Sequence, residues 1–157
     1  MLDPKAVAAW AQASVRAEIA TGCPAELSLA QWRLESGNGE HTLGNNGFGI
    51  KNTDRYPGSQ YLWTTEHWDG KDVRVQQEFE VYPSIEECFK DHALLITTNA
   101  LYQPAFNRFK QDRDLAGLVI RVAWRYATAR DYAERVWEII AASDMKAALA
   151  AARTVHV

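Results

Sequence analysis

Hydrophobic positions recur at helical spacing along most of the chain, in segments that end at clear breaks. The pattern predicts helices over about residues 4–21, 24–35, 85–98, 105–110, 115–126, 131–140 and 144–153, with fraying from Thr154. Asp3 is the expected N-cap of the first segment and Gly22 its end, and Asp131 is the expected cap of the sixth. Ser84 and Glu87 have the spacing of a capping box before the third segment.

Between residues 60 and 82 the helical period gives way to alternation of apolar and polar side chains. Asp69-Gly70 stands between the two alternating runs and predicts a hairpin turn, because glycine accepts the positive φ that such a turn requires. The expected product is a two- or three-stranded antiparallel lobe over about residues 58–82, which needs the helices for its stability. The sequence thus predicts one α+β domain over residues 1–157, mainly α, with a cleft between lobe and helices.

The second predicted helix ends at Glu35, just before the break at residues 36–39. A carboxylate among apolar side chains such as Trp32 and Phe48 is partly removed from water, which raises its pKa. The negative end of the helix dipole acts in the same direction. A general acid at neutral pH needs such a raised pKa. The residues alone also allow, and favour, an exposed helix-end carboxylate followed by a glycine cap.

Composition removes several classes of function. At 157 residues the chain is long enough for a core, and a net charge of −3 without a basic run argues against a nucleic-acid binder. The longest uncharged stretch, residues 93–107, is too short to span a bilayer, so no membrane insertion is expected. The histidines lack paired metal spacing, so neither metal nor cofactor is assigned. Cys23 and Cys88 are expected as buried thiols, with a disulfide as the alternative.

Residues 27–52 resemble the catalytic-helix motif of the glucosaminidase family of peptidoglycan hydrolases, glycoside hydrolase family 73. Family members carry Glu-Ser-Gly-x-Gly and then Asn-x-Phe-Gly-Ile-Lys, which correspond here to residues 35–39 and 46–51. Further family motifs are matched by residues 64–66, 79–84, 87–93, 99–102 and 126–133. The chain departs from the family at Asn38, where an aromatic residue is usual, and at Ala129-Arg130, where Asp-Pro is usual. The resemblance implies a lysozyme-like helical domain with a small antiparallel β-hairpin lobe.

The resemblance also implies the catalytic residues. Cleavage of a glycosidic bond needs a carboxylic acid that protonates the leaving oxygen, and usually a second carboxylate. Glu35 matches the family's acid, and Glu66 matches the hairpin carboxylate, either base or electrostatic partner. Asp91 is expected to support the site by hydrogen bonding, and Tyr126 to bind an acetamide or a water. The structural alternatives are a solvated strand residue for Glu66, an exposed helix charge for Asp91 and a core aromatic for Tyr126.

Four further residues are expected to bind substrate. Phe48 and Tyr132 are candidate faces for sugar stacking, although a single aromatic is more often part of a core. Asn46 and Lys51 are candidates for contact with the glycan or its peptide, with a solvated charge as the alternative for Lys51. The remaining acids near these motifs are expected on the surface; they are Glu40, Asp54, Glu78 and Glu80.

The function implied by the resemblance is that of an endo-β-N-acetylglucosaminidase, cleaving peptidoglycan glycan strands after N-acetylglucosamine. A muramidase or lytic transglycosylase on the same architecture is the nearest alternative. The departures at Asn38 and Ala129-Arg130 also leave open a glycan-binding module without catalysis. A monomer is expected. No signal peptide is visible, which fits a phage endolysin that accumulates in the cytoplasm before release to the wall, or a protein exported by another route.

Overall fold

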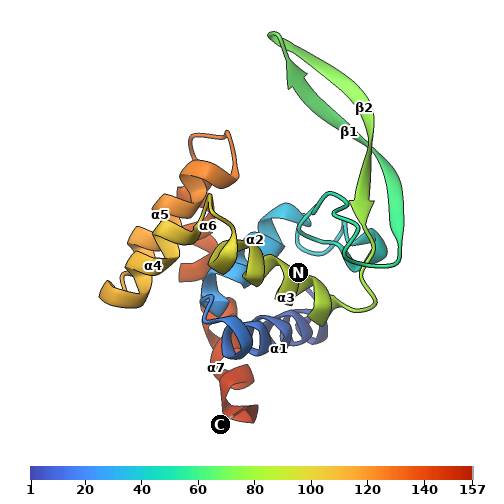
Figure 1. The fold of residues 1–157 in the computed structure, drawn as a ribbon. Coiled ribbons are helices and arrows are strands. Elements are labelled where there is room, and N and C mark those ends of the chain that lie inside the picture. Colours follow the sequence, from blue (N-terminus) through green and yellow to red (C-terminus); the bar gives the residue numbers. More distant parts are fainter. Residues whose placement is uncertain (157) are drawn as a thin grey trace.

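The computed structural model describes residues 1–156, which form seven α-helices, a short 3-10 helix and a two-stranded antiparallel sheet (Figure 1). In chain order the elements are α1 (Pro4–Thr21), α2 (Ala25–Glu35), η1 (Leu43–Asn45), β1 (Ser59–Trp68), β2 (Lys71–Glu80), α3 (Ile85–Thr98), α4 (Gln103–Asp112), α5 (Leu115–Tyr126), α6 (Tyr132–Ala141) and α7 (Ser143–Val155). The predicted α+β class, mainly α with a hairpin lobe, is confirmed. Val157, the last residue of the predicted domain, lies outside the described residues.

The helix ends follow the predicted capping chemistry in part. Asp3 accepts a hydrogen bond from the Lys5 backbone N–H at 3.0 Å, and α1 ends at Gly22 in the left-handed conformation. Ser84 accepts from the Glu87 N–H at 3.2 Å, which is half of the predicted capping box. The other prediction fails: Asp131 stands at the N-cap position of α6, but its side chain accepts no capping bond there.

Two other boundaries differ from the predicted ones. α4 is longer than expected, because Gln103-Pro104 already form its first turn, where proline needs no N–H partner. α7 stays helical through Val155, past the residue at which fraying was expected, and Arg153 near its end is bound by Glu18 and Glu26. Both predictions missed tertiary or proline effects that extend a helix beyond its hydrophobic pattern.

An aromatic cluster at the centre of the core holds the loop that follows α2. Trp32 is fully buried, with its ring 4.8 Å from Phe89 and 5.2 Å from Phe48. A Cβ at Gly47 would lie 2.6 Å from the Trp32 ring, and one at Gly39 would lie 2.5 Å from the Trp10 ring. Only glycine therefore fits at these two positions, so the loop packs directly on the tryptophans and has a defined course after Glu35.

The hairpin stands away from the helices as a long arm (Figure 1). Its register runs from Ser59 opposite Glu80 to Trp68 opposite Lys71, and Asp69 and Gly70 form the turn with φ of 52° and 75°. These positive φ angles are those of the predicted Asp-Gly turn. The sheet of the described residues has two strands, the smaller of the two predicted numbers, and an isolated bridge between Lys51 and Phe79 is added at its base.

The base of the hairpin contains a buried acid, which corrects one surface prediction. Glu80 has no exposed surface, and its carboxylate accepts hydrogen bonds from the backbone N–H and the hydroxyl of Thr53. The segment after the loop runs beside β2, with Asn52 N–H bonded to the Glu78 carbonyl at 2.9 Å, and this segment covers Glu80. Strand alternation alone gave no sign of that cover.

Two composition-based expectations meet the structure directly. Cys23 and Cys88 are both free and buried, so the interpretation as thiols is confirmed over the disulfide. Over residues 1–156, no helix combines the length and the apolar character needed to cross a membrane.

Candidate active site

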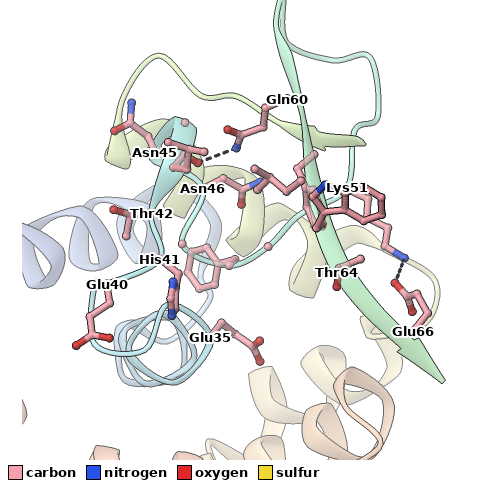
Figure 2. A pocket seen from close by; sticks show the side chains of 18 residues that line it. Glu35, Glu40, His41, Thr42, Asn45, Asn46, Lys51, Gln60, Thr64 and Glu66 are labelled. Atoms are coloured by element: carbon pink, nitrogen blue, oxygen red, sulfur yellow. Dashed lines mark hydrogen bonds and ion pairs between the residues drawn. The ribbon is translucent and has the colours of Figure 1, made fainter. Parts of the chain in front are cut away.

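A groove of about 980 Å³ lies between the helical body and the hairpin. Its walls are the end of α2, the loop over residues 40–49, and one face of β1 with Gln60, Leu62, Thr64 and Glu66 (Figure 2). Binding sites for small molecules and short polymers commonly have volumes of about 300–1,000 Å³. The groove is open to solvent and not enclosed, so a long chain can lie in it without threading.

Glu35 is the last residue of α2 and its carboxylate lies in this groove. The hydroxyl of Tyr132 donates a hydrogen bond to Oε1 of Glu35 at 2.8 Å. Although the residue is reached by solvent through the groove, desolvation by the surrounding protein raises the pKa of Glu35; the Tyr132 bond and the charge of Arg135 lower it by less. Phe48 borders the same groove as predicted, whereas Trp32 is wholly inside the core.

Glu66 reaches the groove from the hairpin, on a different side from Glu35 (Figure 2). Its Oε1 lies 3.5 Å from Nζ of Lys51, so the carboxylate is paired with a cation on its own side of the groove (Figure 2). The structure therefore brings both predicted catalytic carboxylates, which are 31 residues apart in the sequence, to one cavity. Because Glu66 is carried by a projecting hairpin, its distance from Glu35 depends on how the hairpin is placed.

Two tyrosines, Tyr132 and Tyr126, lie close to Glu35. Tyr132, expected as a stacking face, is buried and holds Glu35 through its hydroxyl. Tyr126, expected to bind an acetamide or a water near the acid, stacks on the Tyr132 ring at 5.8 Å and lines a smaller cavity of about 360 Å³ that Glu35 shares. Within residues 1–156 the Tyr126 hydroxyl makes no hydrogen bond. The phenol that contacts the acid is Tyr132.

Three other predicted site residues serve the architecture. The Asn46 carboxamide binds the Ile50 backbone N–H and C=O at 3.0 and 2.8 Å, so it shapes the loop and has little capacity left for a glycan. Phe48 is 4% exposed and stacks on His92, which makes it a core aromatic with only an edge in the groove. Asp91 is 2% exposed and lies outside the groove, bound to Arg55 and Tyr82 at 2.6 Å each.

Two residues that the sequence did not single out belong to the site. Gln31, one turn before Glu35 on α2, donates from its Nε2 to the Tyr132 oxygen at 3.2 Å. His92 on α3 bonds through Nε2 to the Gln31 Oε1 at 2.9 Å. A polar Gln31 inside an apolar helix was the available signal for this network. Among residues 1–156 no three His, Cys, Asp or Glu side chains gather as metal ligands.

Comparison with known proteins agrees with this geometry. Residues 11–145 match the model of the glucosaminidase family, described as mannosyl-glycoprotein endo-beta-N-acetylglucosaminidase. The chain belongs to the glucosaminidase family, and it is therefore a glycoside hydrolase, as the resemblance to glycoside hydrolase family 73 predicted.

Among curated relatives, the peptidoglycan hydrolase FlgJ of Pseudomonas aeruginosa is 33% identical over 147 residues, covering 85% of this chain and 35% of that protein. The FlgJ of Salmonella typhimurium is 33% identical over 128 residues, covering 76% of this chain and 40% of its own length. The chain thus spans less than half the length of the curated relatives that it matches.

Two solved structures show the same fold. The glycoside hydrolase domain of Salmonella typhimurium FlgJ, truncated at its C-terminus, superposes with a TM-score of 0.70 at 28% identity, covering 92% of this chain and 99% of that chain. The catalytic domain of the autolysin Auto from Listeria monocytogenes has a TM-score of 0.79 at 21% identity, with 92% and 85% coverage. The predicted lysozyme-like architecture is confirmed by these superpositions.

Proposed function

We propose that this chain hydrolyses the glycan strands of peptidoglycan, cleaving after N-acetylglucosamine, with Glu35 as the general acid. The observation that carries the proposal is a carboxyl group with a raised pKa, held by Tyr132 in a groove that a second carboxylate, Glu66, faces. The names of the FlgJ relatives support peptidoglycan as the polymer. An open groove suits an internal cut in a long strand.

The acid step uses the protonated carboxyl group of Glu35. Its O–H bond breaks as the proton moves to the glycosidic oxygen, and the electron pair of the breaking C–O bond stays on that leaving oxygen. Glu35 is left as a carboxylate. The Tyr132 hydroxyl already points at Oε1 and stabilises the negative charge that forms there. A water then adds to the anomeric carbon. One of its protons stays in the new hydroxyl group and the other is released, and Glu35 takes up a proton from solvent, which restores the acid.

Glu66 is the candidate group for activating that water, or for stabilising positive charge on the sugar ring. If the substrate's acetamide attacks the anomeric carbon instead, Glu66 becomes an electrostatic helper. Either role requires Glu66 to leave its contact with Lys51 or to share it with substrate. Because that pair is partly exposed, its disruption is expected to require little free energy, about 0–1 kcal/mol.

Analysis of the released sugars tests the proposal. Purified cell walls are digested with the chain, and the new ends are identified by mass spectrometry. A reducing N-acetylglucosamine end supports the proposed bond. A reducing muramic end indicates a muramidase, and an anhydro-muramic end indicates a lytic transglycosylase, which can work with a single acid. Binding to the walls without any new end would leave only a glycan-binding module.

A further inference from the structure

A chain of buried side chains connects Glu35 to α3. Tyr132 donates to Glu35, Gln31 Nε2 donates to the Tyr132 oxygen at 3.2 Å, and Gln31 Oε1 meets His92 Nε2 at 2.9 Å. Gln31 and His92 have no exposed surface. None of the reaction steps described above uses Gln31 or His92, and burial of an amide and an imidazole is costly unless their polar atoms are hydrogen-bonded.

The hydrogen bonds of this chain point in one direction when the Gln31 carboxamide is placed with its Nε2 toward Tyr132 and its Oε1 toward His92. Gln31 Oε1 is an acceptor, so His92 must carry its proton on Nε2 and donate. The ring is neutral because burial lowers the pKa of His92 to about 3, and its Nδ1 has no partner within residues 1–156. With its oxygen occupied by His92, Gln31 presents only its N–H to Tyr132. The Tyr132 hydrogen is then free to point at Glu35.

We propose that Gln31 and His92 are positioning residues that fix the Tyr132 hydroxyl as a donor to Oε1 of Glu35, and thereby keep the acidic proton on Oε2. Oε2 makes no hydrogen bond with residues 1–156, so it is the oxygen available to a substrate. The inference deepens the proposed function, since it rests on Glu35 being the acid. It assigns a purpose to two residues far from any contact with the glycan.

Without the donor at His92, nothing would fix the orientation of the Gln31 carboxamide. The Gln31 carboxamide could then turn over and offer its oxygen to the Tyr132 hydrogen. Tyr132 would present a lone pair to Glu35, and the acidic proton would settle on Oε1, between the two oxygens. That proton would be hydrogen-bonded to the Tyr132 oxygen and turned away from the glycosidic oxygen. The acid would remain in place but would donate poorly, so kcat would fall while substrate binding stayed the same.

The charged and titratable groups around Glu35 are not altered by changes at Gln31 or His92. Tyr132 and Arg135 face it from α6, and Tyr126 from the end of α5. Lys51 and Glu66 lie across the groove. A change in the titration of Glu35 in such variants therefore reports on the hydrogen-bond chain.

The decisive comparison uses two substitutions at His92. His92 stacks on Phe48 with ring centroids 3.9 Å apart, so a replacement that keeps the packing needs an aromatic ring, whereas one that keeps the hydrogen bond needs an N–H donor. His92→Phe keeps an aromatic ring but removes the donor, whereas His92→Gln keeps an N–H donor and loses the ring. We expect His92→Phe to lower kcat about ten-fold, the effect of one hydrogen bond, with KM unchanged, and His92→Gln to recover part of the loss. If His92→Phe were more active than His92→Gln, the proposal would be overturned, because His92 would then contribute only packing.

A double-mutant cycle tests the order of the chain. In a Tyr132→Phe background, Gln31→Met is expected to change kcat less than two-fold, because the hydroxyl that it orients is gone. An equal loss in both backgrounds would contradict the proposal. Thr97→Val is the matched control, since it removes a buried hydrogen bond on α3 that has no link to Glu35. Activities are compared on soluble glycan fragments at a temperature where circular dichroism shows every variant folded.

NMR titration of the free protein separates this proposal from the proposed function. With carboxyl-labelled glutamate, the Glu35 signal is assigned by its loss in Glu35→Gln. Tyr132→Phe is expected to raise the pKa of Glu35, because the donor that stabilises the anion is lost, and His92→Phe to raise it in the same direction. An unchanged pKa in folded His92→Phe would overturn the chain even if walls are cleaved. A raised pKa with no cleavage of any glycan would instead overturn the proposed function alone.

Discussion

Asp91 is a residue whose catalytic and structural roles predict opposite effects of one substitution. The resemblance placed it in the catalytic machinery, whereas the structure places it outside the groove with Arg55 and Tyr82. Removing one partner of a buried ion pair costs about 3–5 kcal/mol. The Arg55 side chain is 49% exposed and can be hydrated again, so we expect Asp91→Asn to cost about 2–3 kcal/mol. For a chain of this length that lowers Tm by roughly 5–10 °C.

Scanning calorimetry measures the change in Tm, and lysis of purified walls at 25 °C measures the change in activity. Folded Asp91→Asn is expected to keep activity within about two-fold of wild type, since Asp91 touches no groove residue that acts on substrate. Asp131→Asn, the same substitution at an exposed acid without a capping bond, is the control for stability and should leave Tm nearly unchanged. An unchanged Tm together with a large loss of activity would return Asp91 to the catalytic machinery.

Three further predictions follow from the site and its support. Glu66→Gln is expected to lower kcat at least ~100-fold with Tm nearly unchanged, because its pair with Lys51 is partly exposed; full activity in digests would exclude it from catalysis. Gly47→Ala places a Cβ 2.6 Å from the Trp32 ring and should lower the free energy of unfolding in urea by about 1–3 kcal/mol; an unchanged value would mean that the loop can shift to make room. His92 has its pKa lowered to about 3 in the folded protein, so its contribution to stability is complete above its ordinary value of 6.5 and is lost as the pH falls toward 3. Unfolding at pH 7 and 4 should differ by about 3 kcal/mol from this residue, and His92→Phe should reduce that difference.

The elements of the fold were largely readable from the sequence because their signals are local. Asp3, Gly22 and Asp69-Gly70 determine helix ends and a turn through interactions within a few residues. Glu35 and Glu66 were placed on the right elements for the same reason, and both line the groove. A family motif supplied the chemistry that periodicity could not.

The contacts of individual side chains were not readable in the same way. Whether Tyr126 or Tyr132 reaches Glu35 depends on how α6 is rotated against α2, and no pattern in residues 126–133 specifies that rotation. Asn46 and Asp91 are polar residues within family motifs, which suggested a role in binding, but each is occupied by a backbone segment or an arginine distant in sequence. Polar residues that stabilise a loop and polar residues that bind a ligand look alike until their partners are known.

The central claim is that Glu35 supplies the proton that cleaves the glycan. The most direct test compares wild type and Glu35→Gln by mass spectrometry of the ends released from purified walls, alongside their unfolding free energies. Because folding raises the pKa of Glu35, its ionisation lowers stability as the pH rises, so the variant should be at least as stable as wild type at neutral pH. We predict a loss of released reducing ends of more than ~1,000-fold in a fully folded variant. Release of the same ends at a rate near that of wild type would contradict the account.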